Sequence, residues 1–111
     1  MSTVTEVLTA ARGLISEPER WTQDCIARDA YGNLAHALSE NAVCWCAVGS
    51  IEKVAADTNP NQYLRSKAIR RLRAVINDRH PGTPSASVYN DSHTHAEVLK
   101  MFDRAIAEGE S

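Results

Sequence analysis

The chain has 111 residues, 43% of them hydrophobic and 23% charged, which allows one domain with a modest core and excludes a globally disordered protein. The formal net charge of −2 is unevenly distributed: residues 60–80 hold six basic side chains and one acid, a sum of +5, which leaves −7 elsewhere. This dipolar distribution indicates contact with an anionic surface as one role for the basic segment.

The cysteine content predicts reduced thiols. The three cysteines are an odd set, and Cys44 and Cys46 are too close in sequence to close a useful disulfide loop. We therefore expect a cytoplasmic protein. The N-terminal stretch MSTVTEVLTAARGLISE lacks the basic start and long apolar run of a signal peptide, and no segment approaches the roughly 20 apolar residues that span a bilayer. The expectation is a soluble protein with no membrane association.

The first predicted helix begins after Thr3, because Thr3 and Glu6 have the spacing of a capping box. Its apolar side chains recur at helical spacing and share one face: Val4, Val7, Leu8, Ala11, Leu14 and Ile15. The pair Glu17-Pro18 ends or bends this helix, since the residue before a proline avoids helical backbone angles.

Residues 19–34 show no clean apolar period, and Tyr31-Gly32-Asn33 is typical of a turn. We predict an ordered loop whose Trp21 docks into the core. A short strand through Cys25–Arg28 is the alternative for this segment.

Two further helices are predicted in the middle of the chain. One begins near Ser39 or Asn41 and runs to about Ala56, with a buried face made by Val43, Cys46, Ala47, Ser50, Ile51 and Val54. The next begins at Asn59, a good N-cap, followed by Pro60 at the first helical position. Its inner face is made by Leu64, Ala68, Leu72, Val75 and Ile76.

The composition of residues 80–85 predicts a loop, and Asn90-Asp91 is read as a turn after Val88 and Tyr89. A fourth helix then begins after Thr94, which forms a capping box with Glu97, and Gly109 stands where a helix stop belongs. Its inward residues are Val98, Phe102, Ala105 and Ile106. The predicted fold is all-α: one domain over residues 1–111, with about four helices packed as a bundle and an ordered loop after the first.

The Cys44-Trp45-Cys46 stretch supports three interpretations. A thiol at a helix start, with His93 or His95 as base, would suit a nucleophile. The two cysteines and two histidines together offer the donor set of a zinc site, although a one-residue spacing is shorter than established zinc pairs use. In the third, Cys46 is simply in phase with the buried face of its helix. We favour the third.

The predicted third helix has a basic outer face, opposite Leu72, formed by Lys67, Arg70, Arg71 and Arg73. Such a face can neutralise phosphates, which makes nucleic-acid binding an alternative. The chain is acidic overall and has few aromatic side chains for stacking on bases. A solvated face with partner-binding potential is therefore preferred.

The sequence resembles a family of small bacterial and phage proteins of unknown function. The matching pieces are WTQ at 21–23, ARDAYG at 27–32, WCAVGSI at 45–51, and YND at 89–91 followed by THAEVLKMFDRAI at 94–106. The resemblance implies a compact helical domain and no activity. It implies that one packed constellation contains Trp21, Trp45, Cys46, Asn90 and Asp91. With the neighbouring His93, these residues form either a binding cleft or a core with a pinned loop.

The leading functional hypothesis is a non-enzymatic accessory or protein-interaction domain, with another protein or a second copy as partner and no cofactor. The first alternative is a thiol enzyme or zinc protein that uses Cys46, His93 and His95, with Asp91 beside them. The second is a nucleic-acid-binding module that uses the basic helix.

Overall fold

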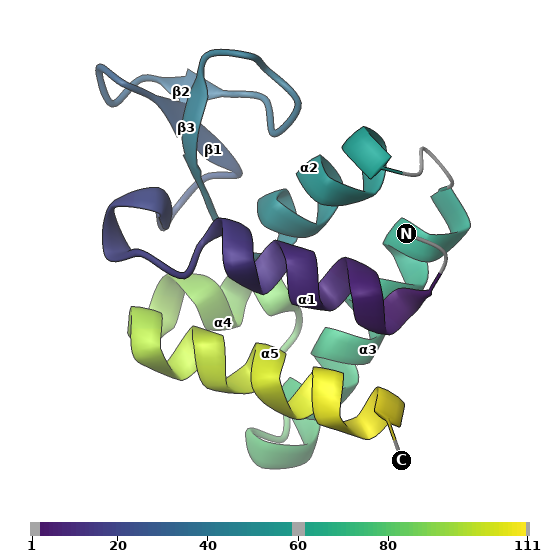
Figure 1. The fold of residues 1–111 in the computed structure, drawn as a ribbon. Helices are drawn as coiled ribbons and strands as arrows, with labels where there is room; N and C mark the ends of the chain where they lie inside the picture. Colours follow the sequence, from purple (N-terminus) through teal and green to yellow (C-terminus); the bar gives the residue numbers. More distant parts are fainter. Residues whose placement is uncertain (1–2, 59–61, 111) are drawn as a thin grey trace.

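A computed structural model describes residues 3–58 and 62–110. This described part contains five α-helices, a 3₁₀ turn and one three-stranded antiparallel sheet (Figure 1). In chain order the elements are α1 (Val4–Leu14), η1 (Pro18–Arg20), β1 (Ala27–Asp29), β2 (Leu34–Ala35), β3 (Ala42–Trp45), α2 (Ala47–Thr58), α3 (Gln62–Arg79), α4 (Ala86–Ser92) and α5 (His95–Glu110). Within these ranges no helix is both long and apolar enough to cross a membrane.

The predicted cap at Thr3 and the predicted capping box of Thr94 with Glu97 are confirmed. Thr3 Oγ1 accepts a hydrogen bond from the Glu6 N–H at 3.1 Å. Thr94 Oγ1 accepts from the Glu97 N–H at 3.2 Å, while the Glu97 carboxylate accepts from the Thr94 N–H at 2.9 Å. These bonds satisfy N–H groups that have no partner within the helix, so α1 and α5 begin where the sequence predicts.

Other helix boundaries depend on less specific signals. The prediction that Gly109 stops the last helix is wrong, because α5 continues to Glu110. A single glycine costs a helix only about 1 kcal/mol relative to alanine and need not end it. The inner face predicted for α3 is confirmed, whereas the predicted cap at Asn59-Pro60 lies outside the described residues.

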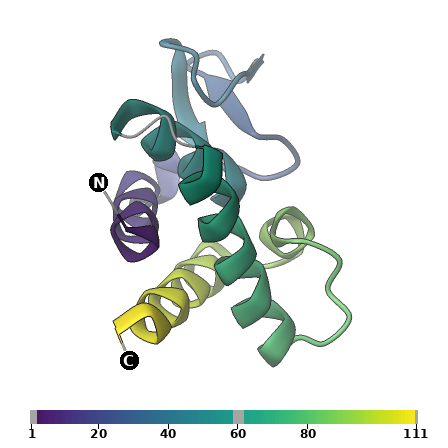
Figure 2. The same ribbon diagram turned by 90° about the vertical axis from the view of Figure 1, so that its right-hand side faces the viewer.

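The helical body is built around α1, which contacts α2, α3 and α5 (Figures 1 and 2). Its fully buried side chains Val7, Leu8 and Ala11 belong to one hydrophobic core. The other helices contribute mainly Ile51, Leu72, Ile76 and Phe102. Burying aliphatic and aromatic side chains of this size contributes about 1.5–3 kcal/mol each, so these contacts are the main source of stability.

The prediction of an all-α fold is wrong at residues 27–45. The segment Ala42–Trp45, expected to open the second helix, is strand β3, and the sheet order is β2-β1-β3. Val43, expected on a buried helical face, is exposed. The segment instead pairs antiparallel with β1, Cys44 opposite Arg28 and Trp45 opposite Ala27. Val43 and Ala47 are four residues apart, so their spacing also fits a helix. Pairing with β1 determines that residues 42–45 form a strand.

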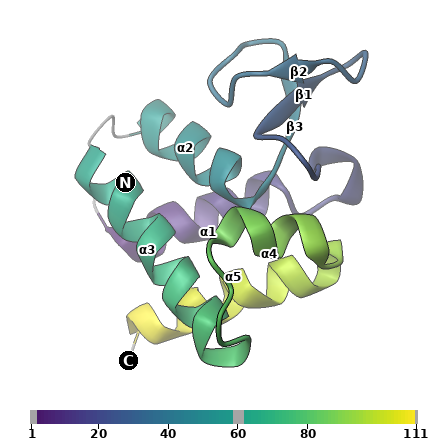
Figure 3. The ribbon, with the colours of Figure 1, turned by 180° about the vertical axis from the view of Figure 1, so that it is seen from behind.

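The prediction of four helices is wrong at residues 86–92. Ser85 caps α4 by accepting from the Val88 N–H at 3.2 Å. Asn90, Asp91 and Ser92 are turn formers in isolation, but here they occupy the last turn of this helix, packed against α2, α3 and α5 (Figure 3). Tertiary contacts therefore override local preference.

The sheet joins the helical body where α2 begins, and it projects from that end (Figure 2). The Cys46 N–H donates to the Ile26 carbonyl at 3.0 Å. One turn later, Gly49 lies so close to the same carbonyl that a Cβ at this position would overlap the oxygen and press on the Ile26 side chain. Glycine is required here by close approach of two backbones.

We expect Gly49→Ala to destabilise the protein by about 1–3 kcal/mol, because the added methyl group can be accommodated only by moving the Ile26 backbone, just before β1, away from α2. Gly13→Ala is the control, since nothing lies within 4 Å of a Cβ at that helical position. The control variant should be neutral or up to about 1 kcal/mol more stable. Urea unfolding measures both, and equal behaviour of the two variants would contradict the predicted overlap.

Candidate functional site

Asn90 is the centre of the cluster that the sequence predicted. Its side chain is fully buried. The carboxamide oxygen accepts from the Trp21 indole N–H at 2.7 Å and from the Ala47 backbone N–H at 3.0 Å. The carboxamide nitrogen donates to the Thr22 carbonyl at 3.0 Å and to Asp91 Oδ1 at 3.1 Å. An amide can donate two hydrogen bonds and accept two, so all of its capacity is used.

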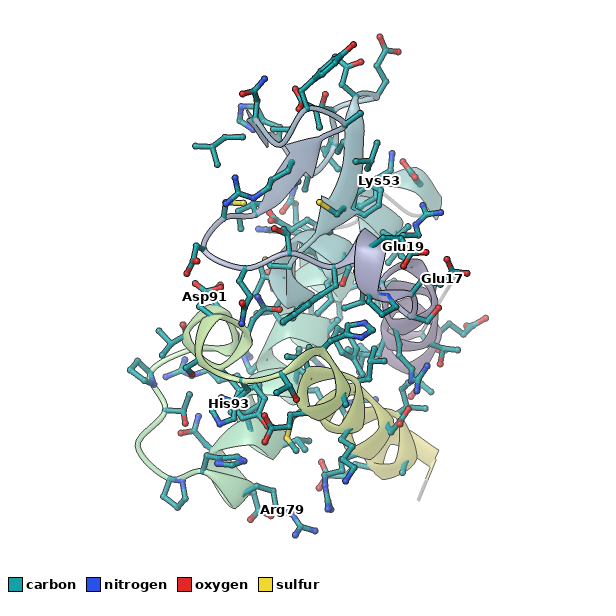
Figure 4. All side chains as sticks on the ribbon, turned by 90° about the vertical axis from the view of Figure 1, so that its left-hand side faces the viewer. Glu17, Glu19, Lys53, Arg79, Asp91 and His93 are labelled. Carbon is teal, nitrogen blue, oxygen red and sulfur yellow. The ribbon has the colours of Figure 1, made fainter. Side chains whose placement is uncertain are left out.

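The segment before β1 is held against the C-terminal end of α4. The Gln23 side chain donates to the carbonyls of Asn90 (3.1 Å) and His93 (2.9 Å), which satisfies groups at and just beyond that helix end. The Asp91 carboxylate accepts from the Asp24 N–H at 2.8 Å, and Asp24 has a left-handed φ of 67°. The Asp91 side chain therefore links the last turn of α4 to this segment. His93 lies farther from the segment, on the side of Arg79 (Figure 4).

Trp45 and Cys46 lie beside this cluster but are closed to solvent. The Trp45 indole donates to the Ala37 carbonyl at 2.9 Å, and the Arg20 guanidinium lies 5.7 Å from the ring centre. Cys46 is 2% exposed, and its sulfur accepts from the Gly49 N–H at 3.3 Å. Burial raises the pKa of the Cys46 thiol to about 11. The thiol is therefore protonated at neutral pH.

The histidines near the cluster make packing and backbone contacts. The His93 ring stacks on Tyr89, with centroids 3.7 Å apart, and its Nδ1 lies 3.0 Å from the Tyr89 carbonyl. His95 Nε2 lies 2.6 Å from the Ile15 carbonyl. No hydrogen bond among the described residues joins either imidazole to Cys46, and in the same ranges no three His, Cys, Asp or Glu side chains converge on a metal position.

The predicted basic surface lies on α3. Lys67, Arg70 and Arg73 are exposed, whereas Arg71 is half-buried and donates to Thr5 Oγ1 at 2.9 Å. The Lys67 ammonium lies 4.8 Å from the centre of the Tyr63 ring. The ion pairs of the described residues use Arg12, Lys53 and Arg65, and none uses the three exposed cations. We refer to Lys67, Arg70 and Arg73 as the basic stripe.

A hollow of about 710 Å³ opens beside the sheet, away from the Asn90 cluster. Its lining is mostly apolar: Cys25, Ile26, Leu34, Ala35, His36, Ala37, Leu38 and Glu52. Leu34 and Leu38 are 73% and 56% exposed, so two large apolar side chains stand in solvent at its margin. This arrangement can hold apolar groups of a ligand.

Comparison with known proteins places the chain in a family. Residues 1–108 match the group described as "Family of unknown function (DUF6197)". The chain is a DUF6197 protein. No curated protein and no solved structure matches it. The assignment confirms that the sequence resembles a family of unknown function, and the description attaches no activity to DUF6197 proteins.

The hollow in this DUF6197 protein was missed by sequence reasoning, which treated residues 19–41 as a loop and the start of a helix. A usable signal was present: Leu34 and Leu38 are large apolar residues in a segment with no helical period and with turn formers before and after it. Apolar residues that fit no core face are candidates for an exposed binding surface.

We expect Asn90→Ala to cost at least about 3 kcal/mol of unfolding free energy, because it leaves the Trp21 and Ala47 N–H groups and the Thr22 carbonyl without a partner. Asn77→Ala is the control, since that side chain makes only an exposed bond to the Arg73 carbonyl. It should change stability by about 0.5 kcal/mol or less. Chemical denaturation distinguishes these outcomes, and a small loss for Asn90→Ala would refute the central role of the cluster.

Alkylation of the folded protein at neutral pH should modify Cys25 and Cys44, which are half-buried, well before Cys46. The reason is that a buried thiol with a raised pKa supplies almost no thiolate. Mass spectrometry of peptides after iodoacetamide treatment measures each site, and all three should react in denaturant. Rapid native labelling of Cys46 would instead indicate a reactive thiol.

Proposed function

We propose that this DUF6197 protein is a non-enzymatic accessory domain that binds another polypeptide through the apolar surface around the hollow. The observation that carries the proposal is the exposure of Leu34 and Leu38 at its margin. Ile26, Tyr31 and Val43 are also exposed in the same part of the chain. A concentration of large apolar side chains on one part of a surface is typical of an interaction site.

Two alternatives have less support. The thiol or zinc hypothesis needs a reactive Cys46, and burial of that side chain with a raised pKa works against it. Nucleic-acid binding is supported by the basic stripe on α3. Its three exposed cations neutralise few phosphates, and the chain outside residues 60–80 carries a charge of −7.

The proposal includes a cytoplasmic location, which the three free cysteines support. A bacterial or phage source is part of the same proposal and rests on the motifs quoted from the sequence.

Selection of a displayed random peptide library against the folded protein tests the binding role. We expect enriched peptides to bind the double variant Leu34→Asp/Leu38→Asp at least about tenfold more weakly, because two charges replace the apolar margin of the hollow. Val88→Asp is the matched control, since Val88 is exposed on α4 and does not line the hollow. Circular dichroism checks that each variant is folded. Absence of enriched peptides, or equal binding to the double variant, would contradict the proposal.

A further inference from the structure

The sheet has one edge that is partly covered and one that is open. On the β3 side, the Thr22 N–H donates to the Trp45 carbonyl at 3.1 Å, and Trp21 forms a bridge with Trp45. On the other side, β2 pairs with β1 and has no further strand beyond it in the described residues. An edge strand presents backbone groups that can pair with another chain.

The pairing pattern identifies which backbone groups are available. The Asn33 carbonyl accepts from the Asp29 N–H at 2.9 Å, and the next pair along the ladder joins Leu34 to Arg28. In an antiparallel pair, successive residues alternate between bonding the partner strand and facing away from it. The N–H and C=O of Leu34 therefore face the open edge.

This edge has one feature that limits strand pairing, because β2 is only two residues long, and it lacks the others. Proteins protect edges with lysine, proline, bulges or covering segments. Residues 21–52 contain no lysine and no proline, and the irregularity in the sheet falls in the β1–β3 pairing rather than at β2. The open edge is thus suited to accept another strand.

The hollow adds places for side chains. Residues 34–38, which comprise β2 and the residues after it, form one wall, and Ile26 and Glu52 lie on other parts of the lining. A strand laid beside β2 directs alternate side chains to the same face. An extended segment with apolar residues at alternate positions can therefore pair with Leu34 and place those residues in the hollow.

Charge selects the kind of partner. Glu52 is the one carboxylate among the residues that line the hollow, which also include His36, and it is part-exposed and 3.0 Å from the Arg65 guanidinium. Residues 22–45 contain three carboxylates, on Asp24, Asp29 and Glu40, and one guanidinium, a sum of −2. That guanidinium, on Arg28, donates to Thr22 Oγ1 and the Gly32 carbonyl. The surroundings favour a basic segment, and β2 of a second copy would bring together two acidic surfaces.

We propose that β2 accepts, as a fourth strand, an extended segment of another protein whose alternate, hollow-facing positions hold apolar residues and one lysine or arginine that can reach Glu52. This inference rests on the proposed function and adds the partner's conformation and charge. Main-chain hydrogen bonds to Leu34 provide part of the affinity, and the hollow and Glu52 provide the selectivity.

The test uses an eight-residue synthetic peptide with three valines and one lysine at alternate positions and threonine between them. Its binding is followed by nuclear magnetic resonance of the isotopically labelled full chain. We expect shifts of the Leu34 and Ala35 amide signals and slower hydrogen exchange at the Leu34 N–H. Two versions of the peptide carry N-methyl groups on alternate backbone nitrogens, one in each register. Only the register that removes the N–H paired with Leu34 should weaken binding, by at least about tenfold. The same peptide with glutamate in place of the lysine should bind more weakly.

Glu52→Gln should weaken binding of the lysine peptide, whereas Asp57→Asn should not. Asp57 is also on α2 and is paired with Lys53, so the control removes the same charge outside the hollow. Both ion pairs are part-exposed, so both variants should fold.

The outcomes separate the two proposals. One outcome is that library-selected peptides need Leu34 and Leu38, but that neither N-methylation register nor Glu52→Gln weakens the binding of these peptides or of the lysine peptide. Strand addition is then overturned, while the binding role remains. If nothing binds the hollow, both fail. A dimer in native mass spectrometry that Leu34→Asp dissociates would make a second copy the occupant and would overturn the basic partner.

Discussion

The fully bonded carboxamide of Asn90 is the interaction on which the arrangement of this protein depends. It joins the Trp21 indole, the Thr22 carbonyl and the Ala47 N–H, which come from two separate parts of the chain, to α4. The Ala47 bond is buried and the other two are part-buried, so loss of the amide would leave groups that are shielded from water without a partner. Because the same amide reaches the start of α2 and the segment before β1, it sets where the sheet stands on the helical body.

This role explains why the residues with the most chemical character are not the most accessible. Trp45, Cys46 and Asn90 are buried because they connect the sheet to the helices. Gly49 permits the same junction by allowing the Ile26 carbonyl to approach α2. The accessible apolar surface lies instead on the far part of the sheet, at Leu34 and Leu38. A rigid junction that carries an exposed edge is a suitable framework for binding another chain.

The charges are segregated in the fold as they are in the sequence. The basic stripe is on α3, whereas residues 22–45 of the sheet region carry a net negative charge. Opposite charges on different elements make the protein dipolar, so an approaching basic segment is attracted toward the sheet and repelled from α3. At physiological ionic strength this steering acts over about 8 Å, which makes it a local aid to orientation.

The sequence alone determined α1, α3 and α5, because each has a long amphipathic period and the first and last have caps made by residues three apart. It also indicated that Trp21, Asn90 and Asp91 belong together, through motifs shared with the family. The strands β2 and β3, α4 and the hollow were decided only by tertiary structure, whereas β1 overlaps the alternative strand through Cys25–Arg28. Each strand has four residues or fewer, too few for a period to be distinguished from a helix, and pairing between Ala27 and Trp45 supplies the missing information. Local preference at Asn90 and Asp91 favours a turn, and only packing of α4 against its neighbours makes this segment helical.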